Sequence, residues 1–157
     1  MTHFSKIIGM ALCASLPISG FAGSADLQKH ESQVIKKYKN LNFYEVNEAI
    51  EREIVDVIAA DPSSFHYGFT QLEKQGFVHV QYSPDKKLKF YSFDVSGGGT
   101  MGEWSSYVQY ATGKTQHLDQ FDSGYINQIL PVNIQNKTVY LVKSYYKGDN
   151  CSGLHHL

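Results

Sequence analysis

The sequence predicts an α+β fold in which two N-terminal amphipathic helices pack on an antiparallel β-meander of about six strands. Three observations lead to this prediction. Apolar residues recur at helical spacing before residue 61, they alternate with polar residues after residue 76, and short turn sequences separate the alternating runs. Such short connections cannot form the long crossovers that parallel strands need, so we expect every strand pair to be antiparallel.

The helical part divides into two segments. Apolar side chains recur near helical spacing from Leu27 to Leu41, which predicts the first helix. Asn42 is a typical N-cap residue, and Glu45 follows it at the spacing of a capping box, so a second helix is predicted to begin there and run to about Ala60. Pro62 ends this helix, because the residue before a proline disfavours the α-region.

The remaining sequence predicts strands at 77–82, 88–93, 105–112, 115–121, 125–134 and 138–146. The turn signals between them are Ser83-Pro84-Asp85-Lys86, Gly113 and Gln135-Asn136-Lys137, while Gly97-Gly98-Gly99 and Asp122-Ser123-Gly124 mark longer breaks. Pro131 predicts that its strand lies at a sheet edge or is bulged.

The sequence after the last predicted strand is short. Lys147-Gly148-Asp149-Asn150 indicates one more turn, and Cys151 to Leu157 is too short to predict a return strand. The strand 138–146 is therefore expected to lack one neighbour, unless the early strands close on it. A shortened sequence that lacks one or more C-terminal strands is an alternative.

The first residues have the pattern of a secretory signal peptide. Lys6 gives a positive start, an apolar stretch runs from Ile7 to Ala22, and small residues allow cleavage after Ala22 or Ala25. The stretch is shorter than the roughly 18 to 20 residues that span a bilayer. We therefore expect a signal peptide at 1–25, one α+β domain at 26–157, a periplasmic or secreted location and no membrane anchor. A buried first helix and lipidation of Cys13 are the alternatives.

Composition excludes some classes of partner and of cross-link. The formal net charge is −1, and Lys and Glu alternate along the chain without a basic block, so nucleic acid is not an expected partner. Signal cleavage removes Cys13 and leaves Cys151 as the sole cysteine, which excludes an intramolecular disulfide. Cys151 is then buried, paired between chains, or left over from a longer protein.

The most distinctive stretch is Pro84-Asp85-Lys86-Lys87-Leu88-Lys89-Phe90-Tyr91-Ser92-Phe93-Asp94. It continues with Gly97-Gly98-Gly99-Thr100-Met101 and with an aromatic-rich strand that ends in Val108-Gln109-Tyr110. This pattern, K-L-x-x-Y-S-x-D followed by G-G-T-M and V-x-Q-Y, resembles uncharacterised secreted bacterial domains over roughly residues 77–146. The resemblance implies no activity, and it implies one or two further strands beyond the end of this chain.

The glycine-rich loop of this stretch is interpreted as structural. Asp94 stands at a strand end, where its carboxylate can accept hydrogen bonds from loop amides, and the glycines allow left-handed backbone. A phosphate-binding loop would require a helix after the glycines, and here a strand follows. The residues assigned to the structural loop are Asp94, Gly97, Gly98, Gly99 and Thr100.

Catalytic and metal sites are weakly indicated, and none is predicted. A nucleophile such as Ser96 or Thr100 could pair with His79 or His117 and with Asp94 or Asp119, but no nucleophile-elbow or cysteine-protease signature is present. The acids Glu73, Asp94, Glu103 and Asp119 fall near turns, where acids are common. Asp149, Cys151, His155 and His156 could ligate a metal, but adjacent histidines on an extended segment point to opposite sides. Asp119 and Asp122 lack the spacing of a calcium loop. No cofactor is expected.

Aromatic residues carry the remaining functional signal. The chain has 11 Tyr and 9 Phe, and neighbours such as Tyr145 and Tyr146 must point to opposite faces of a strand. Part of this aromatic surface is expected to be exposed, where it can stack on a glycan or anchor a protein partner. The candidate ligand-binding residues are Trp104, Tyr107, Tyr110 and Tyr146.

These observations together favour an exported cell-envelope protein that acts as a non-enzymatic binding or interaction module for a protein or glycan. A small envelope hydrolase is the alternative from another functional class. A shortened remnant of a longer secreted protein is the third reading.

Overall fold

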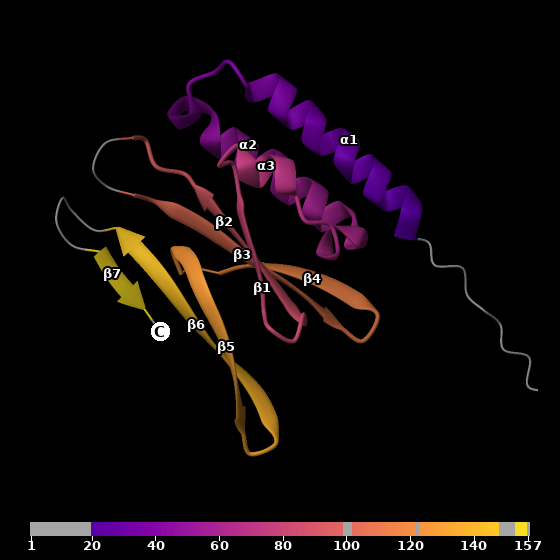
Figure 1. The fold of residues 1–157 in the computed structure, drawn as a ribbon, viewed down its shortest axis with the longest axis vertical. Coiled ribbons are helices and arrows are strands. Elements are labelled where there is room, and N and C mark those ends of the chain that lie inside the picture. Colours follow the sequence, from indigo (N-terminus) through magenta and orange to yellow (C-terminus); the bar gives the residue numbers. More distant parts are fainter. Residues whose placement is uncertain (1–19, 99–101, 122, 148–152, 157) are drawn as a thin grey trace, which may run out of the picture.

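The computed structural model describes residues 20–98, 102–121, 123–147 and 153–156, and it confirms the predicted α+β fold. Two long helices, α1 (Gly20–Tyr38) and α2 (Phe43–Ala60), come first, followed by the 3-10 helix η1 (Pro62–Phe65) and the short helix α3 (Thr70–Lys74). The strands are β1 (His79–Tyr82), β2 (Leu88–Asp94), β3 (Trp104–Thr112), β4 (Thr115–Gln120), β5 (Tyr125–Ile134), β6 (Lys137–Lys147) and β7 (Gly153–His156), as Figure 1 shows.

The strands form two antiparallel sheets, where the sequence predicted one meander. The first sheet has the order β1-β2-β3-β4 and the second has the order β5-β6-β7. After β4 the chain crosses over the first sheet, and β5 does not pair with β4 as a fifth strand of that sheet. Two serines on that sheet hold the crossing, since the Ser106 hydroxyl donates to Gly124 O and the Ser92 hydroxyl accepts from Ile126 N. The division into two sheets therefore depends on side-chain contacts, which the alternation of apolar and polar residues does not reveal.

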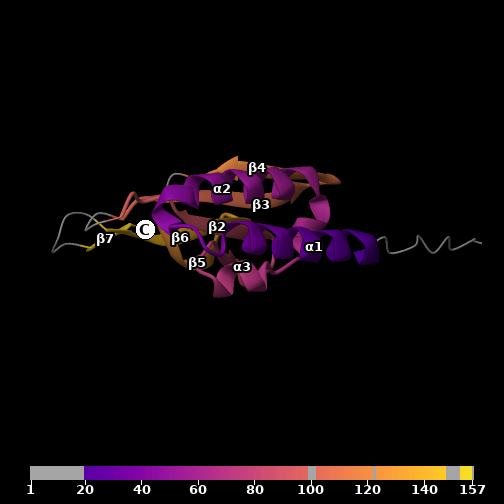
Figure 2. The ribbon, with the colours of Figure 1, turned by 90° about the horizontal axis from the view of Figure 1, so that it is seen from above.

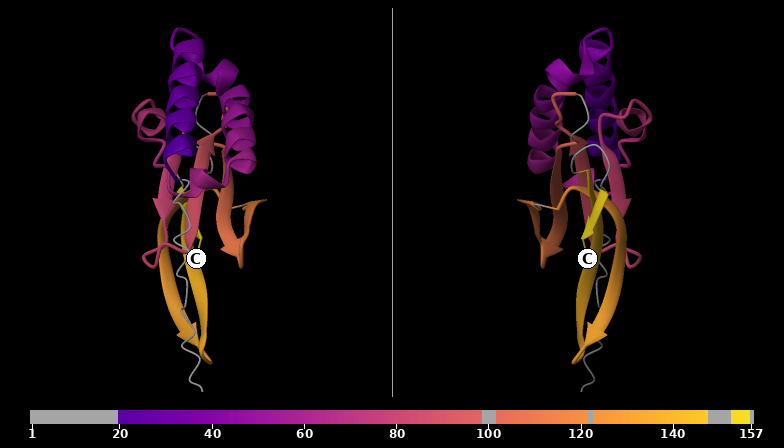
Figure 3. Two further views of the ribbon diagram at one scale, coloured as in Figure 1. Left: turned by 90° about the vertical axis from the view of Figure 1, so that its right-hand side faces the viewer. Right: turned by 90° about the vertical axis from the view of Figure 1, so that its left-hand side faces the viewer.

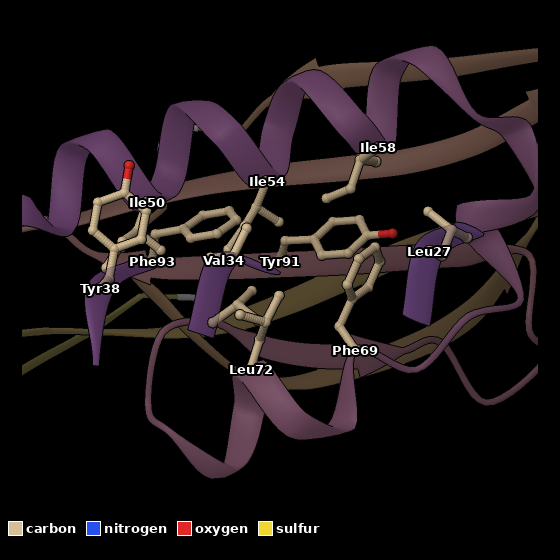
Figure 4. Close-up of a cluster of buried hydrophobic side chains, with 11 residues drawn as sticks. Leu27, Val34, Tyr38, Ile50, Ile54, Ile58, Phe69, Leu72, Tyr91 and Phe93 are labelled. Atoms are coloured by element: carbon tan, nitrogen blue, oxygen red, sulfur yellow. The ribbon is translucent and has the colours of Figure 1, made fainter. Parts of the chain in front are cut away.

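Helices α1 and α2 run alongside each other and cover one face of the first sheet, which we call the inner face (Figures 1 and 2). Tyr91 and Phe93 of β2 point into this layer, as Figure 4 shows. They meet a row of isoleucines on α2, together with apolar residues of α1 and of the α3 segment: Ile50, Ile54, Ile58, Leu27, Val34, Phe69 and Leu72. All of these side chains are buried, so this layer is the main core.

Strand β5 packs across the opposite, outer face of the first sheet. Ile126 and Ile129 are buried there against Phe90 of β2. The β5–β6 hairpin then continues past the sheet as an arm that points away from the helices (Figures 1 and 3). The molecule thus has three layers, which are the helices, the four-stranded sheet and the base of the hairpin.

The helix boundaries agree with the sequence prediction for α2 and differ for α1. Asn42 caps α2 as predicted, because its side chain accepts a hydrogen bond from Tyr44 N and donates one to Glu45. Asp61 ends α2. Helix α1 starts at Gly20 and ends at Tyr38, so Leu41 lies in the turn after it and is exposed, contrary to the prediction that it continues the apolar face.

The predicted signal peptide lies only partly within the described residues. Residues 1–19 are outside them, and the two expected cleavage points after Ala22 and Ala25 fall inside α1. Within the described ranges, no helix has both the length and the apolar character needed to cross a bilayer.

Strand β6 has a neighbour on each side at its end, contrary to the expectation that it lacks one. Residues Ser144–Lys147 pair with Gly153–His156 of β7. The expectation for Pro131 is confirmed, because β5 is an edge strand and carries a bulge between Ile126 and Gln128. Gln135 and Asn136 both have positive φ, which is typical of a two-residue type I′ turn.

Candidate functional site

An apolar groove of about 520 Å³ lies between the outer face of the first sheet and the hairpin. Leu88 and Phe90 of β2 and Val108 and Tyr110 of β3 form its floor. Its other wall comes from β6 and from the segment after β4, with Tyr140, Leu141, Val142, Phe121 and Ser123. The strands position these side chains because alternate residues of β2 and β3 point to the outer face.

Aromatic contacts and two tyrosine hydroxyls shape the groove. The rings of Phe90 and Phe121 meet edge to face, with their centroids 5.5 Å apart. The Tyr140 hydroxyl donates to Asp85 Oδ2 at 2.6 Å, which ties the hairpin to the β1–β2 turn. This bond raises the pKa of Tyr140 to about 12 and lowers the pKa of Asp85. The Tyr110 hydroxyl donates to Asp119 at 2.7 Å, and this bond raises the pKa of Tyr110.

The structure does not bring the predicted aromatic residues to one surface. Tyr110 lines the groove and stacks on His117. Tyr107 points to the inner side, where its hydroxyl donates to Glu51 of α2 at 2.8 Å. Trp104 lies edge to face with Tyr125, and its buried Nε1 has no hydrogen-bond partner among the described residues. The side chain of Tyr146 is outside the described part. Of the described three, only Tyr110 contributes to the groove.

A second, polar cleft of about 640 Å³ lies where β3 meets α2. Glu48, Glu51 and Glu103 line it together with Trp104 and Tyr107. The Tyr107–Glu51 hydrogen bond crosses this cleft and joins the sheet to the helix. Carboxylates are common at protein surfaces, so the acidic lining does not by itself identify a ligand.

The Asp94 loop has the contacts of a folded turn. Asp94 Oδ1 accepts hydrogen bonds from the N–H and the hydroxyl of Ser96, at 2.9 and 2.5 Å. Asn47 of α2 is buried and donates to Ser96 O at 2.7 Å. Gly98 has φ +85° and lies against the Tyr44 ring. Gly97 is exposed, and Gly99 and Thr100 lie outside the described residues. The loop is thereby fixed to the start of α2.

Among the described residues that could form a catalytic triad, Ser96 and Asp94 lie apart from the two histidines. His79 Nδ1 lies 3.2 Å from Glu73, and the His79 ring stacks on Tyr125. Strand pairing places His117 of β4 opposite Tyr110 of β3, and Tyr110 opposite Leu88 at the start of β2. Asp94 lies at the other end of β2, opposite Trp104. Six residues of strand place these positions about 20 Å apart. In the described part of the chain, neither histidine makes a hydrogen bond to Ser96 or Asp94.

No metal site can be assembled from the described residues. Among them, no group of three or more His, Cys, Asp or Glu side chains is close enough to hold an ion. Asp122, Asp149 and Cys151 lie outside the described ranges, and the side chains of His155 and His156 are likewise not described.

Two buried charges of opposite sign, which the sequence did not reveal, hold the segment between α2 and β1. Glu31 of α1 accepts from Gln71 N and Leu72 N, at 2.7 and 2.9 Å, and from the Tyr67 hydroxyl. Burial and the contact with Glu31 raise the pKa of Tyr67. Lys89 of β2 donates to Ser64 O at 2.7 Å and to Tyr67 O. In this segment, two backbone N–H groups and the Tyr67 hydroxyl therefore donate to Glu31, and two backbone carbonyls accept from Lys89.

Lys89 is enclosed by aromatic rings. Its Nζ lies 4.7 to 5.3 Å from the ring centres of Tyr91, Phe69 and Tyr82. Burial lowers the pKa of Lys89 to about 7, while the neighbouring Glu73 opposes this shift. The one signal in the sequence is its position, because Lys89 alternates with Tyr91 and Phe93 and so shares their inner face.

Comparison of the chain with protein-family models, with curated proteins and with solved structures finds no match. The groove and the buried charges therefore have to be interpreted from their own chemistry.

Proposed function

We propose that the protein is an exported, non-enzymatic binding module of the cell envelope, which takes a small apolar molecule into the groove between its two sheets. The observation that carries this proposal is the groove itself. Its volume of about 520 Å³ lies in the range of small-molecule sites, and seven of its nine lining residues are Leu, Val, Phe or Tyr of the strands β2, β3 and β6.

The chemistry of the groove supports an apolar ligand over a glycan. A sugar needs several hydrogen-bonding groups around it, because its buried hydroxyls must be paired. The two tyrosine hydroxyls at the groove already donate to Asp85 and Asp119, so each is committed to a carboxylate. An apolar ligand needs only the apolar walls, which would otherwise remain in contact with water.

A filling substitution tests this proposal. Val108→Trp should occupy the groove and weaken binding of the neutral fluorescent probe N-phenyl-1-naphthylamine at least about tenfold. Val139→Trp is the matched control, because Val139 lies on the opposite face of the hairpin and outside the groove lining. Tyr110→Ala should weaken binding by a smaller factor. Equal probe binding by wild type and Val108→Trp would contradict the proposed site.

Export is tested separately by N-terminal sequencing of the protein recovered from the periplasm or medium. The expected mature chain starts at Gly23 or Asp26. An intact Met1 in the cytoplasm, or lipid on Cys13, would contradict this part of the proposal.

The hydrolase alternative makes a distinct prediction. The purified protein would hydrolyse an ester, peptide or peptidoglycan substrate, and His79→Ala or His117→Ala would abolish the activity. The separation of these histidines from Ser96 and Asp94 favours the binding module.

A further inference from the structure

Large hydrophobic side chains are exposed at two places in the described structure. One is the outward face of the β5–β6 hairpin, with Leu130, Ile134, Val139 and Leu141, of which Leu141 also borders the groove. The other is the α1–α2 corner, with Leu41 and Tyr44. These six side chains are 40% to 54% exposed. Figures 1 and 3 show that the hairpin tip and the α1–α2 corner lie at opposite ends of the long axis of the molecule.

The hairpin face is an apolar stripe with a lysine at each end. Leu130 pairs with Leu141 and Val132 pairs with Val139, so these residues share one face. Lys137 at the tip and Lys143 at the base continue the same alternation along β6. Neither lysine makes an ion pair within the described part of the chain. Two hairpins stacked face to face would bring these lysines together, which disfavours a symmetric hairpin–hairpin contact.

The α1–α2 corner carries the opposite charge on its α2 side. Glu45 and Glu48 are exposed and follow Tyr44 on the first turns of α2. Lys39 precedes Leu41 on the α1 side of the same turn. The corner is therefore a small apolar patch next to two carboxylates. Lys137 and Lys143 lie about 20 Å apart along β6, whereas Glu45 and Glu48 lie three residues apart on one helical face, so one lysine, Lys137 at the hairpin tip, can face this pair of carboxylates.

The hairpin favours docking through its face over strand addition at its edge. Because Gln135 and Asn136 form a two-residue turn, Ile134 and Lys137 are a hydrogen-bonded pair, and the pairs then alternate along the ladder. Pro131, opposite Tyr140, is in a non-hydrogen-bonded pair, so its nitrogen faces the free edge of β5. Proline has no N–H, and the edge lacks a donor at this position.

We propose that the outward hairpin face of one copy of the chain docks on the α1–α2 corner of a second copy, which gives head-to-tail self-association. Such a contact uses two different surfaces and leaves one of each free, so it extends to longer assemblies unless it closes into a ring. The four hairpin side chains expose on the order of 300 Å² of apolar surface, which is the size of a functional patch on a monomer. This area is small against standard interfaces, so the association is weak and depends on concentration.

Sedimentation velocity of two complementary variants tests the proposal. Ile134→Ser/Val139→Ser replaces apolar side chains of the hairpin surface, and neither residue lines the groove. Leu41→Ser/Tyr44→Ser replaces those of the corner surface. Wild type should associate between about 10 and 500 µM, and each variant alone should stay monomeric. An equimolar mixture of the two variants should form a 1:1 dimer and nothing larger, because each partner supplies one intact end.

Charge reversal supplies the second arm. Lys137→Glu should weaken association about tenfold, and Glu45→Lys/Glu48→Lys in the same chain should restore it. Lys143→Glu is the matched control, because it changes the same charge about 20 Å from the tip and should have a smaller effect. Unchanged melting temperatures establish that the variants are folded. A monomeric wild type, association of the corner variant by itself, or no effect of charge reversal would each overturn the proposal. Probe binding in the groove is measured on the same variants and should be unaffected, so the two proposals fail independently.

Discussion

The inner and outer faces of the four-stranded sheet both bury polar groups, and they differ in how completely their apolar side chains are enclosed. On the inner face, the Tyr91 hydroxyl donates to Gln109, Gln109 donates to Ser64, and Ser64 donates to Ile58 O, at 2.6, 2.9 and 3.1 Å. Buried side-chain atoms without a hydrogen-bond partner in the described structure occur on both sides of the sheet, with Gln116 Oε1 on the inner face and Trp104 Nε1 on the outer face.

The difference between the two faces lies in their apolar side chains. Core residues such as Val34 and Ile54 are fully enclosed by helices and sheet. On the hairpin, Ile129 is buried, whereas Leu130 beside it is 40% exposed. The inner face is therefore a fully packed core, whereas the outer side retains a groove and the exposed face of the hairpin. Binding is expected where burial is incomplete, because a ligand or partner can still remove apolar surface from water there.

The largest effect is expected from Glu31→Ala. This change leaves Gln71 N, Leu72 N and the Tyr67 hydroxyl without their acceptor, and it should lower the free energy of unfolding by about 4 kcal/mol. Glu31→Gln keeps one acceptor oxygen and should cost less. Urea unfolding measures both variants. A loss below about 1 kcal/mol for Glu31→Ala would show that the inner network is not important for stability.

The hairpin offers a matched pair of substitutions. Ile129→Ala should lower the free energy of unfolding by about 3 kcal/mol, because a buried side chain is truncated and leaves a cavity. Leu130→Ala, at a side chain that is 40% exposed on the other face of the hairpin, should cost about 0.5 kcal/mol. Similar losses for the two variants would remove the distinction between a buried and a free hairpin face.

Stability should depend on pH through Lys89. The folded protein holds the pKa of Lys89 at about 7, while the unfolded chain keeps the usual 10.5, so the unfolded chain binds more protons between these values. The free energy of unfolding should therefore rise with pH in this window, by up to about 1.4 kcal/mol per pH unit. Above pH of about 10 the trend reverses, because the folded state raises the pKa of Tyr67 and Tyr91.

Lys89→Met is the control for this pH profile, since it keeps a long apolar side chain and removes the titrating group. The slope of urea-derived stability between pH 7 and 9.5 should flatten in this variant. A profile identical to wild type would show that Lys89 does not titrate in this range.

Asp94→Ala tests the loop that joins the sheet to α2. The loss of its hydrogen bonds to Ser96 should cost about 1 kcal/mol, measured as a lower free energy of unfolding. Asp94→Asn keeps an acceptor and should restore part of this loss. If Asp94→Ala were fully stable and had lost a ligand, Asp94 would belong to a functional site.

The sequence by itself determined the elements that depend on local patterns. Apolar periodicity placed both long helices, period-2 alternation placed strands β1 to β6 within a few residues, and Asn42 located the start of α2. Pro131 correctly indicated that its strand lies at a sheet edge. These features are readable because each depends on residues close together in the chain.

Only the tertiary structure decided how these elements combine. The crossing after β4 depends on Ser92 and Ser106, which sit 14 residues apart and meet across the β2–β3 pair. The groove exists because that crossing puts β6 opposite β2 and β3. Of the three aromatic residues chosen from sequence whose side chains are described, only Tyr110 reaches it. Glu31 and Lys89 look like ordinary surface charges in the sequence, since their partners are backbone groups of a distant segment. Contacts between residues far apart in the chain leave no periodic trace, so no local pattern could predict them.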